Sequence, residues 1–324
     1  YGEDNFQNYI LRQYGPTLYK NFFEGYSQKF LGLHPRDTHT DWAKVGINRA
    51  IIDDNAQMQN LYQLLKSTLL QVNKKAQPFL YPADGMHAAW TQVAARIEAL
   101  GGRVILGQGA RIESTGDRIT RVYAGEESFE PSQVIWTAPI TLAAQQLGLP
   151  KPNLQYLGLL LYNVMVQEDC PRDYQWCYYG APELLINRVS IPRFFSPTTA
   201  PAGTTGYCCE VTCREGDARW LHGERLCDWV VDDLVKVGLI RDRRNLIDVR
   251  VERIAESYPV YHKRYPGELQ RARSALSQYS NLNLAGRTGL FWYNNMDHSM
   301  ENAMQLSRRL LQESGRVDTE ESLL

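Results

Sequence analysis

Residues 87–137 constrain the fold of this chain most, because a helical pattern is followed there by several short strand patterns. Apolar side chains at helical spacing run from His87 to Leu100, and the pair Gly101-Gly102 that follows is a common helix ending. A turn at Gly116-Asp117 separates strand-like runs further on. One helix followed by strands and a hairpin predicts an α/β segment. The strands are expected at Arg103–Leu106, near Ile112, at Ile119–Tyr123 and at Gln133–Thr137.

The pattern also predicts how the helix at 87–100 begins and which face it buries. Asp84 precedes the helix, and its side chain is the expected N-cap because it can accept hydrogen bonds from the first free N–H groups. The apolar side chains repeat at helical spacing, so we expect one face in the core. The residues expected to be buried are Trp90, Val93, Ala94 and Ile97.

The chain on either side divides into a helical part and a part rich in strands. Apolar side chains repeat at helical spacing over residues 5–31 and 55–73, with a helix end expected at Gly15-Pro16. Alternating or apolar runs predict strands later in the chain. These strands are expected at 154–167, 184–191, 205–212, 246–254 and 282–285, and helices at 218–237, 268–279 and 297–313.

Composition narrows the classes of protein to consider. A chain of 324 residues corresponds to about two domains. Its net charge is −1, from 35 Lys and Arg against 36 Asp and Glu, which argues against a nucleic-acid binder with a global basic field. No apolar run approaches the roughly 20 residues of a membrane helix. The first residue is Tyr rather than Met, so we expect a chain cut from a longer protein.

The six cysteines are too few, in a chain this long, to form a disulfide scaffold. Cys208 and Cys209 lie in a predicted strand, where neighbouring side chains point to opposite faces. Shared coordination of a metal by this pair is therefore disfavoured, and we predict buried thiols and no metal site. Free thiols are typical of a reducing compartment, so we predict a cytoplasmic protein.

The common nucleotide and hydrolase motifs are missing from the sequence. The nearest glycine-rich run is Gly107–Ile112, which lacks a third glycine and leads into a strand instead of a helix. It cannot aim a helix N-terminus at a pyrophosphate as a complete dinucleotide-binding fingerprint does. The sequence also has no phosphate-cradling GxxxxGK[ST] and no HExxH.

Two segments place polar groups where they could meet a ligand. At 283–299 a predicted strand ends at Gly286-Arg287-Thr288-Gly289, and a helix is expected to begin near Asp297. Glycines allow close approach, and a helix start attracts electron-rich groups, although a plain strand–loop–helix connection has the same pattern. Arg188 lies in an apolar run, where alternation places it on the less apolar face, toward solvent or a cavity.

Together these pieces resemble the flavin amine oxidase, protoporphyrinogen oxidase and UDP-galactopyranose mutase superfamily over nearly the whole chain. The stretches that carry the resemblance are 5–32, Tyr81–Met86, the helix–glycine–strand–hairpin block after it, and Gly286–Ser299. The last, with its aromatic run and Asn295-Met296-Asp297-His298-Ser299, is most similar to the mutase branch. The amino-terminal GxGxxG unit of such proteins is absent from this sequence.

The resemblance implies a fold, a cofactor and a set of site residues. The fold would be a partial FAD-binding domain interleaved with a helical and antiparallel-sheet substrate domain. We expect segments 1–78 (helical substrate part), 79–140 (partial FAD-binding part), 141–280 (substrate-binding sheet) and 281–324 (C-terminal FAD-binding part). The residues implied to contact FAD are Gly109, Ala110, Gly286, Arg287, Asn295, Met296 and Asp297.

For the mutase branch, the resemblance also implies substrate contacts. Arg188 would pair with the diphosphate of a nucleotide-linked sugar, and Tyr258 and Tyr293 would hydrogen-bond to it. The predicted function is therefore mutase-like chemistry with a reduced flavin, in cell-surface polysaccharide (LPS) biosynthesis. One alternative is a flavin amine oxidase or protoporphyrinogen oxidase type of oxidoreductase. Another is that this chain is a non-catalytic fragment that cannot hold FAD.

Overall fold

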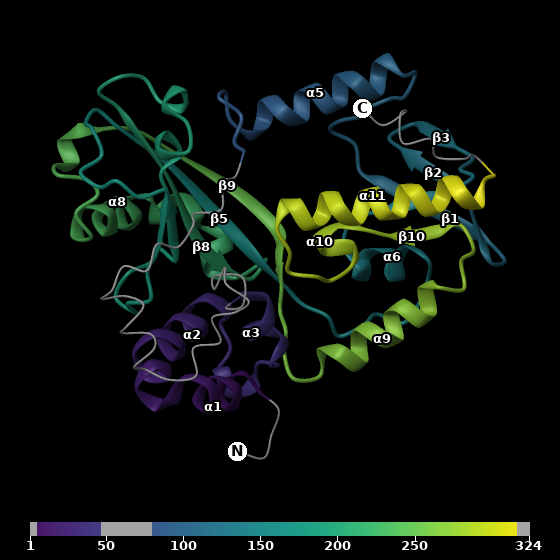
Figure 1. The fold of residues 1–324 in the computed structure, drawn as a ribbon, viewed down its shortest axis with the longest axis horizontal. Helices are drawn as coiled ribbons and strands as arrows, with labels where there is room; N and C mark the ends of the chain where they lie inside the picture. Colours follow the sequence, from purple (N-terminus) through teal and green to yellow (C-terminus); the bar gives the residue numbers. More distant parts are fainter. Residues whose placement is uncertain (1–4, 47–79, 316–324) are drawn as a thin grey trace. The chain divides into compact units, whose positions relative to one another are not determined.

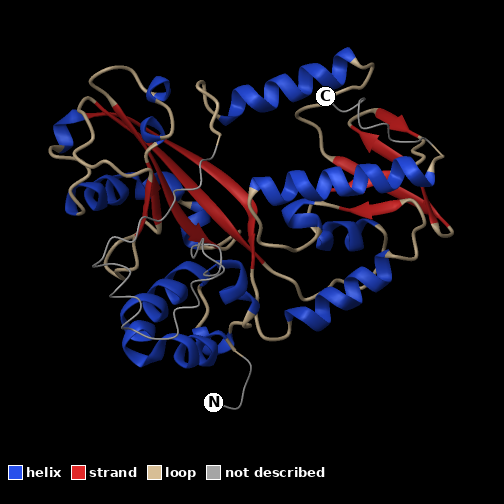
Figure 2. Cartoon of the chain, in the orientation of Figure 1, coloured by secondary structure: helices blue, strands red, loops and turns tan. Residues whose placement is uncertain are grey.

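The computed structural model describes residues 5–46 and 80–315. Helices and strands are mixed along this part of the chain, which confirms the predicted fold class (Figure 1, Figure 2). The predicted helix at 55–73 lies outside the described residues. None of the helices described in these two ranges is sufficiently long and apolar to cross a membrane.

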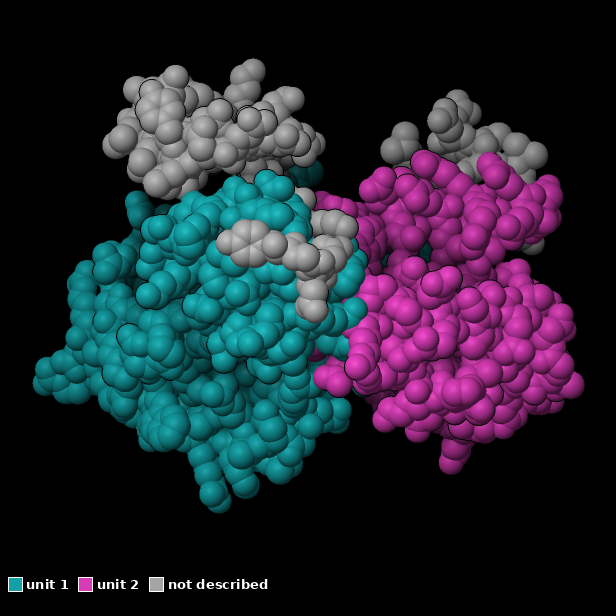
Figure 3. Space-filling model, turned by 90° about the horizontal axis from the view of Figure 1, so that it is seen from below, with its two compact units in different colours: residues 1–104, 156–257, 261–263 teal, residues 105–155, 258–260, 264–324 magenta. Residues whose placement is uncertain are grey.

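The chain forms two compact units, coloured separately in Figure 3, and each is discontinuous in sequence. Unit 1 contains residues 1–104, 156–257 and 261–263; unit 2 contains residues 105–155, 258–260 and 264–324. The expected segments and these units divide the chain at different places. Residues 79–104, expected with the FAD-binding part, lie in unit 1, whereas residues 141–155, 258–260 and 264–280, expected with the sheet, lie in unit 2.

The helical part of unit 1 follows the predicted pattern closely. Helix α1 (Phe6–Leu18) is kinked at Gly15, whose φ of 77° is left-handed, and Pro16 follows inside the helix. A π-helical turn (Tyr19–Glu24) then leads into α2 (Gly25–Leu31), and α3 (Asp41–Gly46) comes next. The rings of Phe30 and Trp42 stack at 5.7 Å and are buried, whereas Phe22 is 65% exposed, so the aromatic side chains of this stretch pack only partly in the core.

The sheet of unit 1 has five strands in the order β6-β7-β8-β5-β9. Antiparallel pairs join β6 to β7, β7 to β8 and β8 to β5. The face that carries Leu160, Tyr162 and Cys209 is buried in the main core with helix α8 (Cys227–Lys236). The strands are β5 (Tyr156–Val166), β6 (Trp176–Tyr178), β7 (Arg188–Ser190), β8 (Thr205–Cys213) and β9 (Leu246–Pro259).

The prediction of a single helix at 218–237 is wrong, because the helix is interrupted at Gly223. It forms α7 (Ala218–Leu221), a 3-10 turn (Gly223–Leu226) and α8. The buried Tyr162 hydroxyl donates a 2.8 Å hydrogen bond to the Gly223 carbonyl, which removes that carbonyl from a helical ladder. A Cβ at Gly223 would also lie 3.2 Å from Arg253 Nη2 and 3.3 Å from Leu160 Cδ2, so a larger residue there would require these side chains to shift.

Three expectations about residues 84–106 are also wrong. Helix α5 (Met86–Ala99) has Gly85 as its N-cap in place of Asp84, and none of its residues is buried. Trp90, Val93 and Ile97 are 44%, 47% and 42% exposed, because no described residue covers the apolar face of α5. Residues 103–106 belong to no strand, since no described strand pairs with them.

Unit 2 combines a small antiparallel sheet with a pair of parallel strands. The buried Asn281 side chain exchanges hydrogen bonds with the backbone of Ile119, at 2.8 and 3.0 Å, and fastens β2 to the segment before β10. The strands are β1 (Ala110–Thr115), β2 (Arg118–Ala124), β3 (Glu127–Phe129) and the parallel pair β4 (Val134–Trp136) and β10 (Leu282–Leu284). The helices are α6 (Ile140–Gln146), α9 (Tyr265–Leu276), α10 (Gly286–Gly289) and α11 (Met296–Glu313).

Candidate functional site

The parallel strands β4 and β10 end side by side in unit 2, at the paired residues Trp136 and Leu284. The Thr288 hydroxyl donates to the Thr137 carbonyl at 2.7 Å, which holds α10 against the end of β4. A side chain at Gly289 would lie 2.5 Å from the Trp136 carbonyl oxygen, so the backbone there must approach closely. The carboxyl ends of parallel strands are where ligands bind in open α/β sheets.

Arg287 lies at this edge and contacts the rings of both predicted tyrosines. Its guanidinium carbon is 5.4 Å from the ring centre of Tyr258 and 5.2 Å from that of Tyr293. The two rings are themselves 5.4 Å apart, and Arg287 also donates to the Asn294 carbonyl. Cation–π contacts with two rings fix the guanidinium in place. The structure therefore brings Tyr258, Arg287 and Tyr293 together, and we call them the Arg287 cluster.

Helix α11 begins immediately after this cluster. Asn295 is its N-cap in an extended conformation, but its side chain makes no capping hydrogen bond. Asn294 is buried and donates from Nδ2 to the Ser299 hydroxyl at 3.0 Å. Met296 is 43% exposed and Asp297 lies in the first turn. The start of α11 therefore has N–H groups without a side-chain cap, and its dipole favours negative charge nearby.

Gly109 and Ala110, the other residues predicted to contact FAD, lie in unit 2 at the start of β1. Gln146 of α6 donates to the Ala110 carbonyl at 3.0 Å and accepts from the Ile112 N–H at 2.9 Å. Gly109 is exposed, and an added side chain there would meet no atom within 4 Å. These two residues are thus open to a ligand, while the described hydrogen bonds connect them to α6 and not to the Arg287 cluster.

Arg188 lies in unit 1, on strand β7, with the orientation that alternation predicts. It forms an ion pair with Glu210 of β8, whose side chain is 5% exposed, while the Arg188 side chain is 29% exposed. Its guanidinium carbon lies 5.8 Å from the ring centre of Tyr178 on β6. Arg188 is therefore accessible, but its charge already has a carboxylate partner.

Strand pairing shows which other side chains share the face of Arg188. Tyr178, Arg188, Glu210 and Leu161 lie directly opposite one another across four strands, and Trp176, Ser190, Cys208 and Asn163 form the next row. Directly opposed residues of antiparallel strands point to the same face. We call these eight residues the open face. Trp176 and Tyr178 are 44% and 49% exposed there.

The sequence analysis did not single out Trp176 or Tyr178. Their spacing of two, Trp-Cys-Tyr, is the alternating pattern of a strand and could have indicated two rings on one face. The strand has only three residues, so the pattern is too short to stand out.

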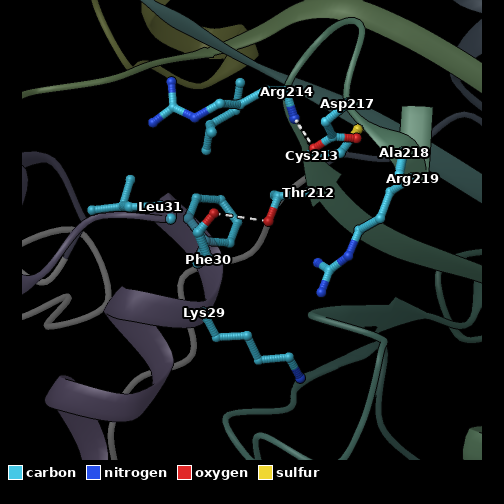
Figure 4. A pocket seen from close by; sticks show the side chains of 11 residues that line it. Lys29, Phe30, Leu31, Thr212, Cys213, Arg214, Asp217, Ala218 and Arg219 are labelled. Carbon is cyan, nitrogen blue, oxygen red and sulfur yellow. Dashed lines mark hydrogen bonds between the residues drawn. The ribbon is translucent and has the colours of Figure 1, made fainter. Parts of the chain in front are cut away.

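A separate pocket of about 340 Å³ lies in unit 1 between α2 and the end of β8 (Figure 4). Lys29 and Arg219 extend to the same side of it, while the Arg214 guanidinium points away from them. Lys29 donates to three backbone carbonyls, and burial lowers its pKa to about 8. Its ammonium is thus occupied in joining α2 to the loop before β7, and the pocket contains no residue predicted for the site.

Comparison with protein-family models and with curated proteins gave no match. Among solved structures, reduced UDP-galactopyranose mutase is 17% identical with a TM-score of 0.77, covering 96% of this chain and 68% of the mutase chain. A candidate protoporphyrinogen oxidase from Exiguobacterium sp. 255-15 is 17% identical with a TM-score of 0.61, covering 92% and 66%. A double mutant of putrescine oxidase is 12% identical with a TM-score of 0.60, covering 95% and 68%.

The chain therefore has the fold shared by UDP-galactopyranose mutase, the candidate protoporphyrinogen oxidase and putrescine oxidase, which confirms at the level of fold the resemblance found in the sequence. Among these three neighbours, UDP-galactopyranose mutase superposes with the highest TM-score, and the sequence had also favoured that branch. The chain spans about two thirds of the length of each neighbour.

Proposed function

We propose that the protein is a flavin-dependent enzyme with mutase-like chemistry on a nucleotide-linked sugar. The observation that supports this most is the Arg287 cluster, which joins a fixed cation and two tyrosines to the start of α11 at the ends of two parallel strands. The fold shared with UDP-galactopyranose mutase supports it at the level of architecture.

The residues around the start of α11 suit the isoalloxazine ring of FAD. Gly286 has a left-handed φ of 72° and Gly289 packs tightly on β4. Residues 286–289 therefore lie close to β4, and Arg287 is the cation beside the start of α11. The helix dipole, the N–H groups of Asn295, Met296 and Asp297, and the Arg287 charge all favour an electron-rich ring edge. When bound, a reduced flavin would supply a nucleophile for the sugar and be released unchanged, because the isomerisation has no net change in oxidation state.

The remaining site residues would bind and orient the substrate. The hydroxyls of Tyr258 and Tyr293 can donate to phosphate oxygens. Arg188, in unit 1, has guanidinium N–H groups of the kind that donate to phosphate or hydroxyl oxygens. Gly109 and Ala110 would approach the adenine end of FAD through their backbone. The proposal includes a role in cell-surface polysaccharide synthesis in the cytoplasm, because the proposed substrate is a nucleotide-linked sugar.

The proposal is tested by turnover of UDP-galactopyranose with the purified protein and added FAD, with and without dithionite. We expect an isomerised nucleotide sugar only in the reduced sample, with no oxidant consumed. Hydrogen peroxide released on an amine or another apolar substrate, without reductant, would instead favour the oxidase alternative. Absence of both activities and of bound flavin would favour a non-catalytic fragment.

A further inference from the structure

Two large aromatic side chains are exposed at the edge of the unit 1 sheet, beside a charged pair. Trp176 and Tyr178 are close to half exposed and point to the open face, where Tyr178 lies directly opposite Arg188. Arg188 in turn lies opposite Glu210. An exposed ring costs hydrophobic free energy, so two of them on one face of an edge strand indicate a surface that a ligand covers.

Each of the two rings contacts another ring of unit 1. Phe195 stacks on Trp176 with centres 5.8 Å apart and an angle of 13°, and Tyr81 contacts Phe195 at 5.1 Å. Tyr26 meets Tyr178 edge-on at 5.7 Å. Rings fixed in this way lose little conformational entropy when a ligand binds on them.

The charge of the open face suits a neutral ligand better than a phosphate. The Glu210 carboxylate is almost fully buried and forms an ion pair with Arg188, so the two charges compensate each other. An added dianion would have to compete with Glu210 for the guanidinium. Hydroxyl groups, in contrast, can accept from guanidinium N–H groups without displacing the carboxylate. Ser190 and Asn163, in the neighbouring row, add a hydroxyl and an amide.

We propose that the open face is a saccharide subsite, in which Trp176 and Tyr178 stack against the C–H face of a neutral sugar ring and Arg188 donates to its hydroxyls. The negative faces of aromatic rings attract the weakly positive C–H groups of a pyranose. This inference rests on the proposed function, since it assigns the sugar part of the nucleotide-linked substrate. It also moves Arg188 from a diphosphate contact to a hydroxyl contact.

The test is ligand-observed saturation-transfer NMR on the purified protein, with methyl β-galactopyranoside and UDP titrated separately. We expect the neutral glycoside to bind and Trp176→Ala to weaken its binding at least fivefold. Trp229→Ala is the matched control, because Trp229 is 62% exposed on α8 and lies outside the open face. The proposal is overturned if the wild-type protein binds no glycoside, or if both Trp variants bind it equally.

A second variant tests the role given to Arg188. Glu210→Gln removes the compensating charge, so we expect UDP to bind at least threefold more tightly while the glycoside binds more weakly. If this variant does not fold, Tyr178→Ala serves, and we expect it to weaken glycoside binding at least threefold without changing UDP binding. If Trp176→Ala or Tyr178→Ala weakens the binding of UDP but not that of the glycoside, the two rings bind the uracil base of UDP instead of a sugar, and the proposal fails. Neither titration needs flavin or turnover, so failure here is distinct from failure of the proposed enzyme activity.

Discussion

Lys29 shows how a single polar side chain can organise several segments of unit 1. Its ammonium donates to the carbonyls of Tyr179, Ala181 and Ile186, at 2.9, 3.1 and 2.6 Å. All three donors of the ammonium are used, and all three acceptors lie about 150 residues further along the chain. No local sequence pattern could indicate these partners, because the fold alone brings them together.

Replacing Lys29 by methionine keeps the aliphatic stem and removes the three hydrogen bonds. We expect Lys29→Met to lower the free energy of unfolding by about 1–3 kcal/mol, because charge-assisted bonds to buried carbonyls are lost. Urea unfolding followed by circular dichroism measures this. Lys236→Met, which alters a lysine that is largely exposed, is the control, and equal losses in both variants would contradict the prediction.

The effect of Lys29 on stability should also depend on pH. Burial lowers its pKa from 10.5 to about 8 in the folded protein. Between these two pH values the unfolded chain binds more protons at this residue, so folding becomes more favourable as the pH rises. We therefore expect the difference in unfolding free energy between wild type and Lys29→Met to grow from pH 7.5 to pH 10. A difference that shrinks over this range would show that the pKa is not lowered.

For single residues, the sequence predicted the face to which a side chain points better than it predicted the residue that the side chain contacts. Alternation placed Arg188 on the less apolar face, and the structure agrees. Glu210, which compensates its charge, lies 22 residues away on another strand and could be identified only from strand register. Tyr258 and Tyr293 come from different elements, and the resemblance to a family, rather than any spacing, suggested that they belong together.

Among the elements, α10 and β4 are in unusually close contact. A Cβ at Gly289 would lie 2.5 Å from the Trp136 carbonyl oxygen and 3.3 Å from the Thr137 Cα. We expect Gly289→Ala to push α10 away and to lower the free energy of unfolding by about 1–3 kcal/mol. Gly109→Ala in the same unit is the control, since a Cβ there meets no atom within 4 Å. Equal urea midpoints for the two variants would contradict this packing.

The elements that the sequence predicted wrongly share a physical cause. Helical spacing continued through Gly223, but a tertiary hydrogen bond from Tyr162 breaks the helix there. Apolar spacing on α5 predicted a buried face, yet burial needs a covering partner, and the described residues provide none. Periodicity identifies which face is apolar, whereas other segments decide whether that face is buried.

At the scale of the whole molecule, the sequence predicted the fold through a resemblance and not through local patterns. Both compact units are assembled from separated segments, and the last helix, α11, packs in unit 2 through a 2.7 Å bond from Arg309 to Asn283 of β10. The interleaving places Arg287 and the start of α11 beside Tyr258, which is near the end of the long strand β9. The proposed cofactor site is made of such distant segments, so it depends on topology rather than on any single motif.

The central claim is that the Arg287 cluster and the start of α11 hold the flavin. Titration of FAD into the purified protein, followed by quenching of flavin fluorescence, tests it most directly. We predict saturable binding that Arg287→Met weakens at least tenfold and that Arg308→Met, an exposed arginine on α11, leaves unchanged. No binding to the wild-type protein, or equal affinity in the two variants, would contradict the claim.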